Sequence, residues 1–472
     1  MTPEDITFLQ TGEPWPYDIE RMARYEDYKK LFLGDHDQIA GWQTAFNIIQ
    51  REDPNLIHVL HNLPQAIPKL FADLLVGETP KLSAQDDSSQ EWLDEYTKSN
   101  KVHRLIHKGV HSQSYRGDAV LKLSLIDGKA KLSLVPACFW FPIINEADVT
   151  EADGHVFAWT TKRGDQEYLR AEIHFAGSVH QRAFVLSGNM IGARVPVTSL
   201  GVNLEEDQET LVDQMLVAVI PNRELDDSIY GLSDYDGIDS LFQQLDMRFS
   251  QIAKILDKHS SPGMYGPTNI DIDPTSGEAL PQRTDAYIEV PQGETTPGYL
   301  TWDANLEANW TFVEKILDAI YIATGTNRAA FGLLDGTNAL SGSALKKILM
   351  RTLQEVNNKR IKWDEALKYI IPLSAELERA NSGDAPQDLD LTIEWQDGLP
   401  DDPLEDAQVE SIRTGGKATS SVKSAIRRLD GGSDDSIEEE LALIDEEEEV
   451  PMPTQTPFFK VLTGEGEDDE LE

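Results

Sequence analysis

Two long amphipathic stretches, separated by a proline-rich segment, constrain the fold of this chain more than any other feature. Apolar residues recur every three or four positions over residues 238–256 and again over residues 306–324, which is the spacing of one helix face. Six prolines fall within residues 261–303, and proline interrupts a helix. The pattern therefore predicts two helices, over 232–260 and 304–325, that flank a small β-rich insertion.

A different periodicity dominates residues 118–220. Apolar residues alternate with polar ones on both sides of Asp127-Gly128, a dipeptide that favours a tight hairpin turn. Three helices are predicted before this block, over residues 17–33, 63–76 and 91–114. Because helices and strands occur in separate runs, the sequence predicts an α+β fold.

The C-terminal part of the chain is predicted to be mainly helical. A loop over residues 326–340 precedes the longest helix, over 341–380, which Pro372 is expected to interrupt. Residues 389–395 alternate as one strand does. Three short helices are predicted at the end, over residues 403–415, 420–429 and 434–449.

The charge of the chain limits its function. It has 83 acidic and 41 basic residues, a net charge of −42, and this disfavours a tight sequence-reading DNA binder because phosphate contacts need a basic surface. Seventeen acidic residues and one lysine fall in residues 429–472, and residues 451–472 are predicted to form a mobile acidic tail. The acidity is therefore not confined to the tail.

Cysteine content and hydropathy set the expected compartment. The single cysteine, Cys138, excludes an intramolecular disulfide and a zinc site made of several thiolates. The N-terminus lacks the pattern of a signal peptide, and no run approaches the apolar length of a membrane helix. We expect a protein made in a reducing cytoplasm, without a membrane partner.

Three short patterns are candidates for catalytic or metal sites. His103, His107 and His111 lie four residues apart on a predicted helix, a spacing that could bind zinc, but no acidic general base stands between them. Ser343 and Lys346 match the S-x-x-K pattern without its companion K-T-G.

The third pattern, Asp271-Ile272-Asp273, does not continue as a calcium loop. We therefore predict no catalytic, cofactor-binding or metal-binding residues.

The longest predicted helix is the most basic segment of this acidic chain. Its cations are Lys346, Lys347, Arg351, Lys359, Arg360 and Lys362. They are expected to pair with Glu355, Asp364 and Glu365 or with neighbouring subunits. The alternative is contact with a polyanion.

The order of these parts resembles the portal proteins of tailed double-stranded DNA bacteriophages. The similar motifs are residues 24–36 (RYEDYKKLFLGDH), the helix over residues 62–80 that closes near Gly77 and Pro80, Gly117-Asp118-Ala119, Gly231-Leu232-Ser233-Asp234, residues 341–346 (SGSALK) and the helical region over residues 415–449. Together these motifs cover most of residues 20–450.

The resemblance implies a portal fold of named parts. These are a wing (1–231), a stem helix (232–260), a clip (261–303), a second stem helix (304–325), a tunnel loop (326–340), a long wing helix with a returning strand (341–400), a crown (401–450) and the tail (451–472). The family forms a ring, usually of twelve subunits, at one capsid vertex of the virion after assembly in the host cytoplasm. It is not an enzyme and needs no cofactor.

The resemblance also implies partners and contact residues. The ring would guide double-stranded DNA during packaging and ejection, dock the terminase large subunit and then a head-completion adaptor, and contact the major capsid and scaffolding proteins. DNA would pass the tunnel-loop residues Asn327, Arg328, Phe331, Leu333 and Leu334. Polyanion or inter-subunit contacts would fall on Lys346, Lys347 and Arg351, and partner docking on the clip residues Tyr287, Ile288 and Glu289.

Two other functions fit parts of the sequence. One is an intracellular enzyme, either a hydrolase that uses Ser343 and Lys346 or a metal-dependent enzyme that uses the three histidines. The other is an acidic binding protein that mimics DNA. The enzyme predicts a monomer or a small oligomer, and the DNA mimic predicts tight binding to a basic partner and no ring. A portal predicts a ring of many subunits.

Overall fold

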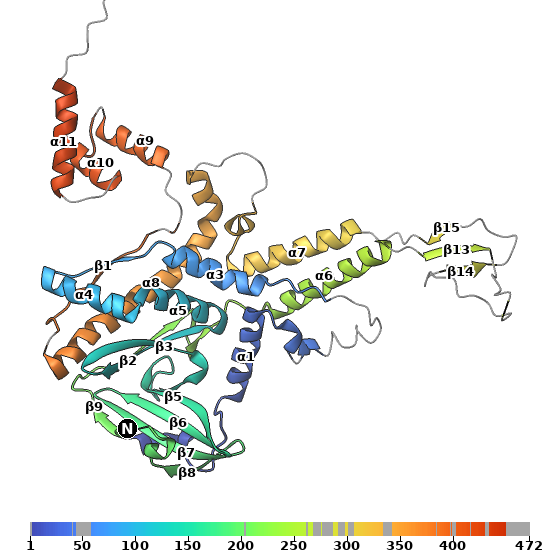
Figure 1. Ribbon diagram of the computed structural model, residues 1–472, viewed down its shortest axis with the longest axis horizontal. Coiled ribbons are helices and arrows are strands. Elements are labelled where there is room, and N and C mark those ends of the chain that lie inside the picture. Colours follow the sequence, from blue (N-terminus) through green and yellow to red (C-terminus); the bar gives the residue numbers. More distant parts are fainter. Residues whose placement is uncertain are drawn as a thin grey trace, which may run out of the picture. The chain divides into compact units, whose positions relative to one another are not determined.

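The computed structural model is a mixed α+β structure that divides into two compact units (Figure 1). The first unit comprises Met1–Asn338 and Lys346–Leu399, and the second comprises Ala339–Leu345 and Pro400–Glu472. The structure describes residues 2–39, 41–43, 58–202, 204–260, 263–267, 275, 287–290, 298–300, 306–333, 342–383, 385–396, 398, 403–415, 417–429 and 434–449. No helix in these residues is long and apolar enough to cross a membrane.

Helices supply much of the core of the first unit. Its N-terminal helices are α1 (Ile19–Leu33), α3 (Leu63–Val76), α4 (Asp87–Asn100) and α5 (Val102–Arg116). The single helix predicted over 91–114 is wrong, because Lys101 adopts a left-handed φ of 53° and separates α4 from α5. The Asn100 side chain explains the break. It is buried and bonds to the backbone of a neighbouring strand, at Ala130 O (3.3 Å) and Leu132 N (2.9 Å).

A three-stranded antiparallel sheet connects the helices to the larger sheet. Its strands are β10 (Val217–Pro221), β2 (Asp118–Ile126) and β3 (Lys129–Val135), in that order. The predicted turn between β2 and β3 is confirmed, since Asp127 and Gly128 have φ values of 50° and 75°. Alternate residues of β2 face opposite ways: Leu121 belongs to the helical core, and Val120 packs with Trp140 and Phe157 of the larger sheet.

The larger sheet is antiparallel and has a separate apolar core. Its order is β4 (Trp140–Ile144), β5 (Ala152–Arg163), β6 (Gln166–Phe175), β7 (Ser178–Ser187) and β8 (Met190–Val195), and β9 (Asp207–Glu209) also pairs with β7. The N-terminal segment covers one side of this sheet. There Phe8 and Trp15 join the core, and Pro14 bridges to Met190 of β8.

Two long helices lie side by side and antiparallel: α6 (Asp239–Ser260) and α7 (Leu306–Thr324) (Figure 1). Leu245, Ile252, Val313, Ile316 and Ile320 are buried in their contact with the core. The start predicted for α6, at residue 232, is wrong. Residues 233–238 form turns instead, because Gly237 has a φ of 81° that no helix contains.

Three short strands lie between α6 and α7 in the sequence. They are β13 (Gly263–Pro267), β14 (Tyr287–Val290) and β15 (Gly298–Leu300). β13 is central, and it pairs in parallel with β14 and antiparallel with β15. The described part of the proline-rich segment is therefore a small sheet.

The longest helix, α8 (Gly342–Ser382), crosses the helical core of the first unit and contains Pro372. Trp363 is completely buried, and its indole N–H donates to Gln113 Oε1 of α5 at 3.0 Å. Gly109 makes this close packing of α5 and α8 possible, since a Cβ atom there would lie 2.3 Å from the Trp363 ring. After α8, β16 (Thr392–Glu394) pairs with β1 (Lys81–Ser83), so the predicted strand is confirmed.

The second unit is helical, as predicted. It contains α9 (Pro403–Thr414), α10 (Val422–Leu429) and α11 (Asp434–Glu449). α10 packs against both of the other helices. Ala425 and Ile426 of α10 and Ile437 of α11 are buried.

Candidate functional site

The segment that follows α7 is a structured turn rather than an open loop over residues 325–333. α7 ends at Thr324, and the next residue, Gly325, has a left-handed φ of 68°. The Asn327 side chain then caps a short 3-10 helix (Arg328–Phe331) by accepting a hydrogen bond from Ala329 N at 2.9 Å. Gly332, with a φ of 78°, ends this helix. Leu334 lies outside the described residues.

The two sides of this turn differ in exposure. Phe331 packs against the core, with its ring 5.7 Å from that of Tyr321, whereas Arg328 is exposed and Leu333 is 55% exposed. The Thr352 hydroxyl of α8 donates to Gly325 O at 3.2 Å and fixes the base of the turn. Of the residues predicted to contact DNA in this part, Arg328 and Leu333 are therefore the accessible ones.

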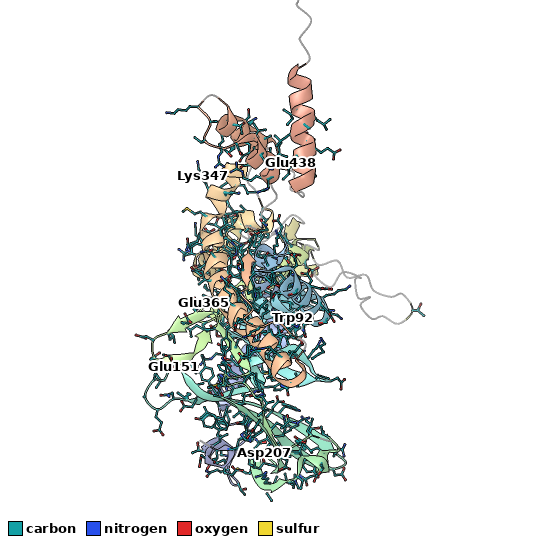
Figure 2. All side chains as sticks on the ribbon, turned by 90° about the vertical axis from the view of Figure 1, so that its left-hand side faces the viewer. Trp92, Glu151, Asp207, Lys347, Glu365 and Glu438 are labelled. Carbon is teal, nitrogen blue, oxygen red and sulfur yellow. The ribbon has the colours of Figure 1, made fainter. Side chains whose placement is uncertain are left out.

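The beginning of α8 lies next to this turn, because Asn327 Nδ2 donates to Ile348 O at 3.2 Å. Lys346 and Lys347 are exposed here. Figure 2 labels Lys347 near the beginning of α8 and Glu365 farther along the same helix. The Arg351 side chain is 68% exposed and lies 3.6 Å from Glu355. The turn and the first part of α8 thus present a group of accessible cations in an acidic chain.

The cations farther along α8 have a structural role. Lys359 is 4% exposed, and its ammonium lies 2.9 Å from Asp234 Oδ2 and also donates to Asn222 Oδ1. Lys362 lies 2.8 Å from Glu224. The expectation that these lysines pair with acids of their own helix is wrong for both, because the strands and turns that precede α6 bring in other carboxylates.

A buried polar junction forms where α5, α8 and the turn before α6 meet. Its members are Ser114, Asn222, Asp234 and Lys359. Asp234 accepts hydrogen bonds from the Ser114 hydroxyl at 2.6 Å and from Asn222 Nδ2 at 2.8 Å, in addition to the Lys359 contact. Burial lowers the pKa of Lys359, and the charge of Asp234 opposes this shift. The ion pair is therefore supported by neutral hydrogen-bond partners on both sides.

A second buried carboxylate lies beside the hairpin β11 (Arg223–Leu225) and β12 (Ser228–Leu232). Asp118 accepts hydrogen bonds from Gly231 N and from the Tyr25 hydroxyl, both at 2.9 Å. Burial raises the pKa of Asp118 to about 7, although both of these bonds oppose the shift. A Cβ atom at Gly117 would lie 2.2 Å from Gly231 O. The sequence motifs around residues 117 and 231 thus meet in space.

Sequence reasoning did not predict that Ser114, Asn222 and Asp234 surround Lys359 in a buried polar junction. Asp234 falls within the Gly231–Asp234 motif, but nothing local shows that its side chain is buried. Ser114 is 120 residues away from it in the sequence, and Asn222 is 137 residues away from Lys359. Covariation between such distant positions among related sequences would be the signal that these residues are in contact.

The histidines on α5 do not form a metal site. His107 Nε2 lies 3.0 Å from Asp73 Oδ1, and the rings of His107 and His111 are 4.9 Å apart. Burial lowers the pKa of His103, and lowers that of His111 to about 4. No group of three histidine, cysteine or acidic side chains in the described part of the chain could hold a metal ion.

The other patterns of interest for catalysis fall outside what the structure describes. Asp271 and Asp273 lie outside the described residues, as does the side chain of Ser343. For Tyr287, Ile288 and Glu289 the structure gives only the position on β14, opposite Met264, Tyr265 and Gly266 of β13.

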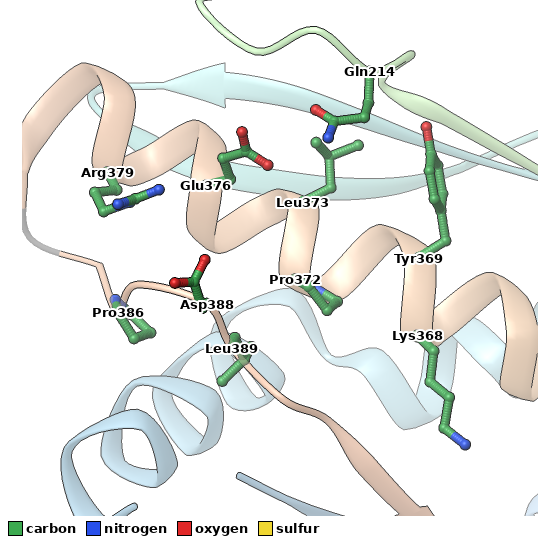
Figure 3. Close-up of a pocket in the computed structure, with 10 residues that line it drawn as sticks. All are labelled: Gln214, Lys368, Tyr369, Pro372, Leu373, Glu376, Arg379, Pro386, Asp388 and Leu389. Atoms are coloured by element: carbon green, nitrogen blue, oxygen red, sulfur yellow. The ribbon is translucent and has the colours of Figure 1, made fainter. Parts of the chain in front are cut away.

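The cavity beside Pro372 has a volume of about 300 Å³. Figure 3 shows the residues that line it, which are Gln214, Lys368, Tyr369, Pro372, Leu373, Glu376, Arg379, Pro386, Asp388 and Leu389. Lys368 is paired with Asp364 at 2.7 Å, and the Tyr369 hydroxyl donates to Met215 O at 2.8 Å. None of these lining residues is a serine, cysteine or histidine.

Comparison with known proteins gives one family. The model of the family described as phage portal protein, SPP1 Gp6-like, matches residues 15–452. No curated protein matches the sequence.

The solved structures that match this chain include three from gene transfer agent (GTA) particles. A chain from the neck of a native GTA particle, computed with C12 symmetry, is 12% identical, with a TM-score of 0.44 over 89% of this chain and 96% of that one. A chain from the neck of an empty GTA particle with C6 symmetry is 13% identical, with a TM-score of 0.43 over 78% and 90%. A chain from the virion of a native gene transfer agent particle is 11% identical, with a TM-score of 0.45 over 89% and 96%.

Proposed function

Because the chain belongs to the SPP1 Gp6-like family of phage portal proteins, we propose that its copies form a ring through which double-stranded DNA enters and leaves a capsid. The observation that carries this proposal is the family match, which extends over residues 15–452. The ring would occupy one vertex of the virion and would assemble in the host cytoplasm. Twelve copies is the number expected for the family. The family is structural, and we propose a conduit without catalytic activity.

The parts of the fold suit this role. We propose that the N-terminal helices and sheets form the wing, α6 and α7 the stem, and the small sheet between them the clip. α8 and β16 would return to the wing, and α9 to α11 would form the crown. The antiparallel contact of α6 and α7, with strands inserted between them in the sequence, supports this assignment.

The net charge of −42 supports passive guidance of DNA. A basic tunnel would bind the duplex tightly through counterion release, whereas an acidic one repels it and lets it slide. In this setting the few accessible cations near the turn after α7 would make local contacts. We propose that Arg328 and Leu333 face the DNA, and that Lys346, Lys347 and Arg351 contact DNA or the next subunit.

Docking would take place on the small sheet. We propose that the part of β14 that holds Tyr287, Ile288 and Glu289 contacts first the terminase large subunit, which supplies ATP-driven movement, and later the head-completion adaptor. The wing would contact the major capsid and scaffolding proteins. The support for these partners is the family alone.

A double variant of the exposed turn residues tests the proposed DNA contact. In particles assembled with Arg328→Ser/Leu333→Ser, we expect the amount of packaged DNA to fall several-fold while the rings remain intact. The capping residue Asn327 and the packing residue Phe331 are retained, so the turn keeps its supports. DNA content per particle, measured by quantitative amplification, is compared with ring mass measured by light scattering.

The matched control is Lys315→Ser, an exposed position on α7 whose ammonium lies 3.3 Å from Asp318 of the same helix. It should package as the unmodified chain does. Normal DNA content in the double variant would show that this turn does not contact the DNA. Loss of rings would show that its exposed side chains serve assembly.

A further inference from the structure

The corner between α4 and α5 contains a hollow with a volume of about 450 Å³. Its lining comes from the second half of α4, the first turn of α5 and the residue between them, and consists of Asp94, Thr97, Lys98, Lys101, His103 and Arg104. The side chains of Lys98, Lys101 and Arg104 are exposed. Three cations therefore surround one hollow in a chain that has about twice as many acidic as basic residues.

These three cations lack acidic partners. Among the residues that the structure describes, no carboxylate lies within ion-pair distance of Lys98, Lys101 or Arg104. The acidic residue of the lining, Asp94, instead accepts a hydrogen bond from Gln90 Nε2 at 2.8 Å. By contrast, the two lysines of α1 each lie beside an acidic residue of their own helix. The positive charge of the hollow is therefore not neutralised by the chain itself.

Two of the cations are placed unfavourably for α5. The amino end of a helix carries partial positive charge, so acidic residues stabilise it and cations destabilise it. The first turn of α5 has no acidic residue, and Lys101, which precedes it, provides no side-chain cap. Arg104 adds a further positive charge in the same turn. The stability of α5 therefore does not explain the position of Lys101 and Arg104, whereas an anionic ligand would.

Two other lining residues have unused hydrogen-bonding groups. The Thr97 hydroxyl and His103 Nδ1 are buried and have no hydrogen-bond partner in the described part of the chain, although buried polar atoms normally have one. Burial also lowers the pKa of His103, so its ring is neutral at pH 7. The charged groups of the lining are thus three cations and one carboxylate, which leaves a net charge of +2.

We propose that this hollow binds a doubly charged phosphate group of a small phosphate compound. Such a group carries a charge of about −1.5 to −2 at pH 7, which matches the lining, whereas a carboxylate or a phosphodiester carries one charge. Lysine and arginine are the side chains that bind phosphate most strongly. Lys108 is also exposed and lies one turn beyond Arg104 on the same face of α5. A ligand with two linked phosphates would gain this further cation.

Calorimetric titration of the full chain with inorganic pyrophosphate tests the site. We expect saturable binding to the unmodified chain, and an affinity weaker by about ten-fold or more in Lys101→Gln/Arg104→Gln, because two of the three cations are lost. The matched control is Lys29→Gln/Lys30→Gln on α1, which removes the same charge from lysines that have acidic partners. It should bind as the unmodified chain does. Equal affinities in the two double variants would overturn the proposal.

Thermal unfolding separates a binding role from a structural one. Without pyrophosphate, Lys101→Gln/Arg104→Gln should melt no lower than the unmodified chain, because it removes cations from the positive end of α5. Pyrophosphate should raise the melting temperature of the unmodified chain and leave that of the variant unchanged. A variant that melts lower in the absence of pyrophosphate would show that the two cations stabilise the fold, and would overturn the proposal.

Competition at one ionic strength identifies the class of anion. A nucleoside triphosphate, which has a doubly charged terminal phosphate, should displace pyrophosphate. Duplex DNA or polyglutamate that binds the hollow more tightly than pyrophosphate would identify phosphodiesters or carboxylates as the ligand, and either result would overturn the proposal. None of these outcomes decides whether the copies form a ring, which is measured separately as mass.

Discussion

Replacement of Lys359 by methionine is expected to lower the free energy of unfolding of the first unit by about 3–5 kcal/mol. The variant leaves Asp234 charged and without its cation in a buried position, where Asp234 is 8% exposed. The hydrogen bonds from Ser114 and Asn222 remain but do not neutralise the charge. Urea unfolding followed by tryptophan fluorescence, at one subunit concentration, measures the change.

Two companion variants identify the cause. Lys359→Met/Asp234→Asn removes both charges and should recover most of the lost stability, because the polar junction then contains no unpaired charge. Lys362→Met removes a cation whose ion-pair partner, Glu224, has a side chain that is 62% exposed, and it also removes a hydrogen bond to Asn222 O. Its effect should therefore stay below about 2 kcal/mol. Equal losses for Lys359→Met and Lys362→Met would contradict the assigned role of the polar junction.

Replacement of Asp118 by asparagine is expected to change the pH dependence of stability. The folded chain keeps the Asp118 proton up to about pH 7, whereas the unfolded chain releases it near pH 3.8. Unfolding therefore releases a proton between these values, and the unmodified chain loses stability as the pH rises through this range. Asparagine has no such proton, and its side-chain oxygen can still accept from Gly231 N.

The stability difference between Asp118→Asn and the unmodified chain should therefore grow in favour of the variant from pH 4 to pH 7 and then level off. The upper bound is roughly 4 kcal/mol, since one pKa unit corresponds to about 1.4 kcal/mol. Thermal unfolding at several pH values measures the difference. Asp165→Asn, at an exposed position in the turn between β5 and β6, is the control. A difference for Asp118→Asn that stays constant with pH would contradict the account.

Local signals in the sequence predicted much of the secondary structure. The Asp127-Gly128 turn needs two positive φ values, and the residues that supply them are identifiable without other information. The spacing of apolar residues also predicted α7 and α8 close to their observed bounds. This signal is local too, because the apolar face of a helix repeats every three or four residues. The three helices of the second unit follow the same rule.

The wrong predictions of helix bounds share one cause, which is contact between residues far apart in the sequence. The division of α4 from α5 at Lys101 depends on Asn100 bonding to a strand that begins 29 residues later. The start of α6 was misplaced because Gly237 has a φ of 81° and because the side chains of Ser233 and Asp234 bond to Ser114 of α5 instead of beginning a helix. Such contacts depend on tertiary structure, and propensity alone does not encode them.

In the candidate site, too, the sequence predicted the local features and missed those that depend on tertiary contacts. The sequence predicted a loop after α7 and a basic beginning of α8, since both are contiguous in the chain, and their contact with DNA stays a prediction. It did not distinguish Phe331, which packs against Tyr321, from Leu333, which is exposed. It also treated Lys359 and Lys362 as part of one basic segment with Lys347, although burial and partners give them another role.

Assembly is the central claim, and one measurement tests it most directly. Light scattering of the purified full chain, combined with negative-stain images of the same sample, gives both mass and symmetry. A portal predicts a ring of about twelve chains of 52.7 kDa each, with an open centre. A discrete monomer or dimer at high protein concentration, without rings in the images, would contradict the account.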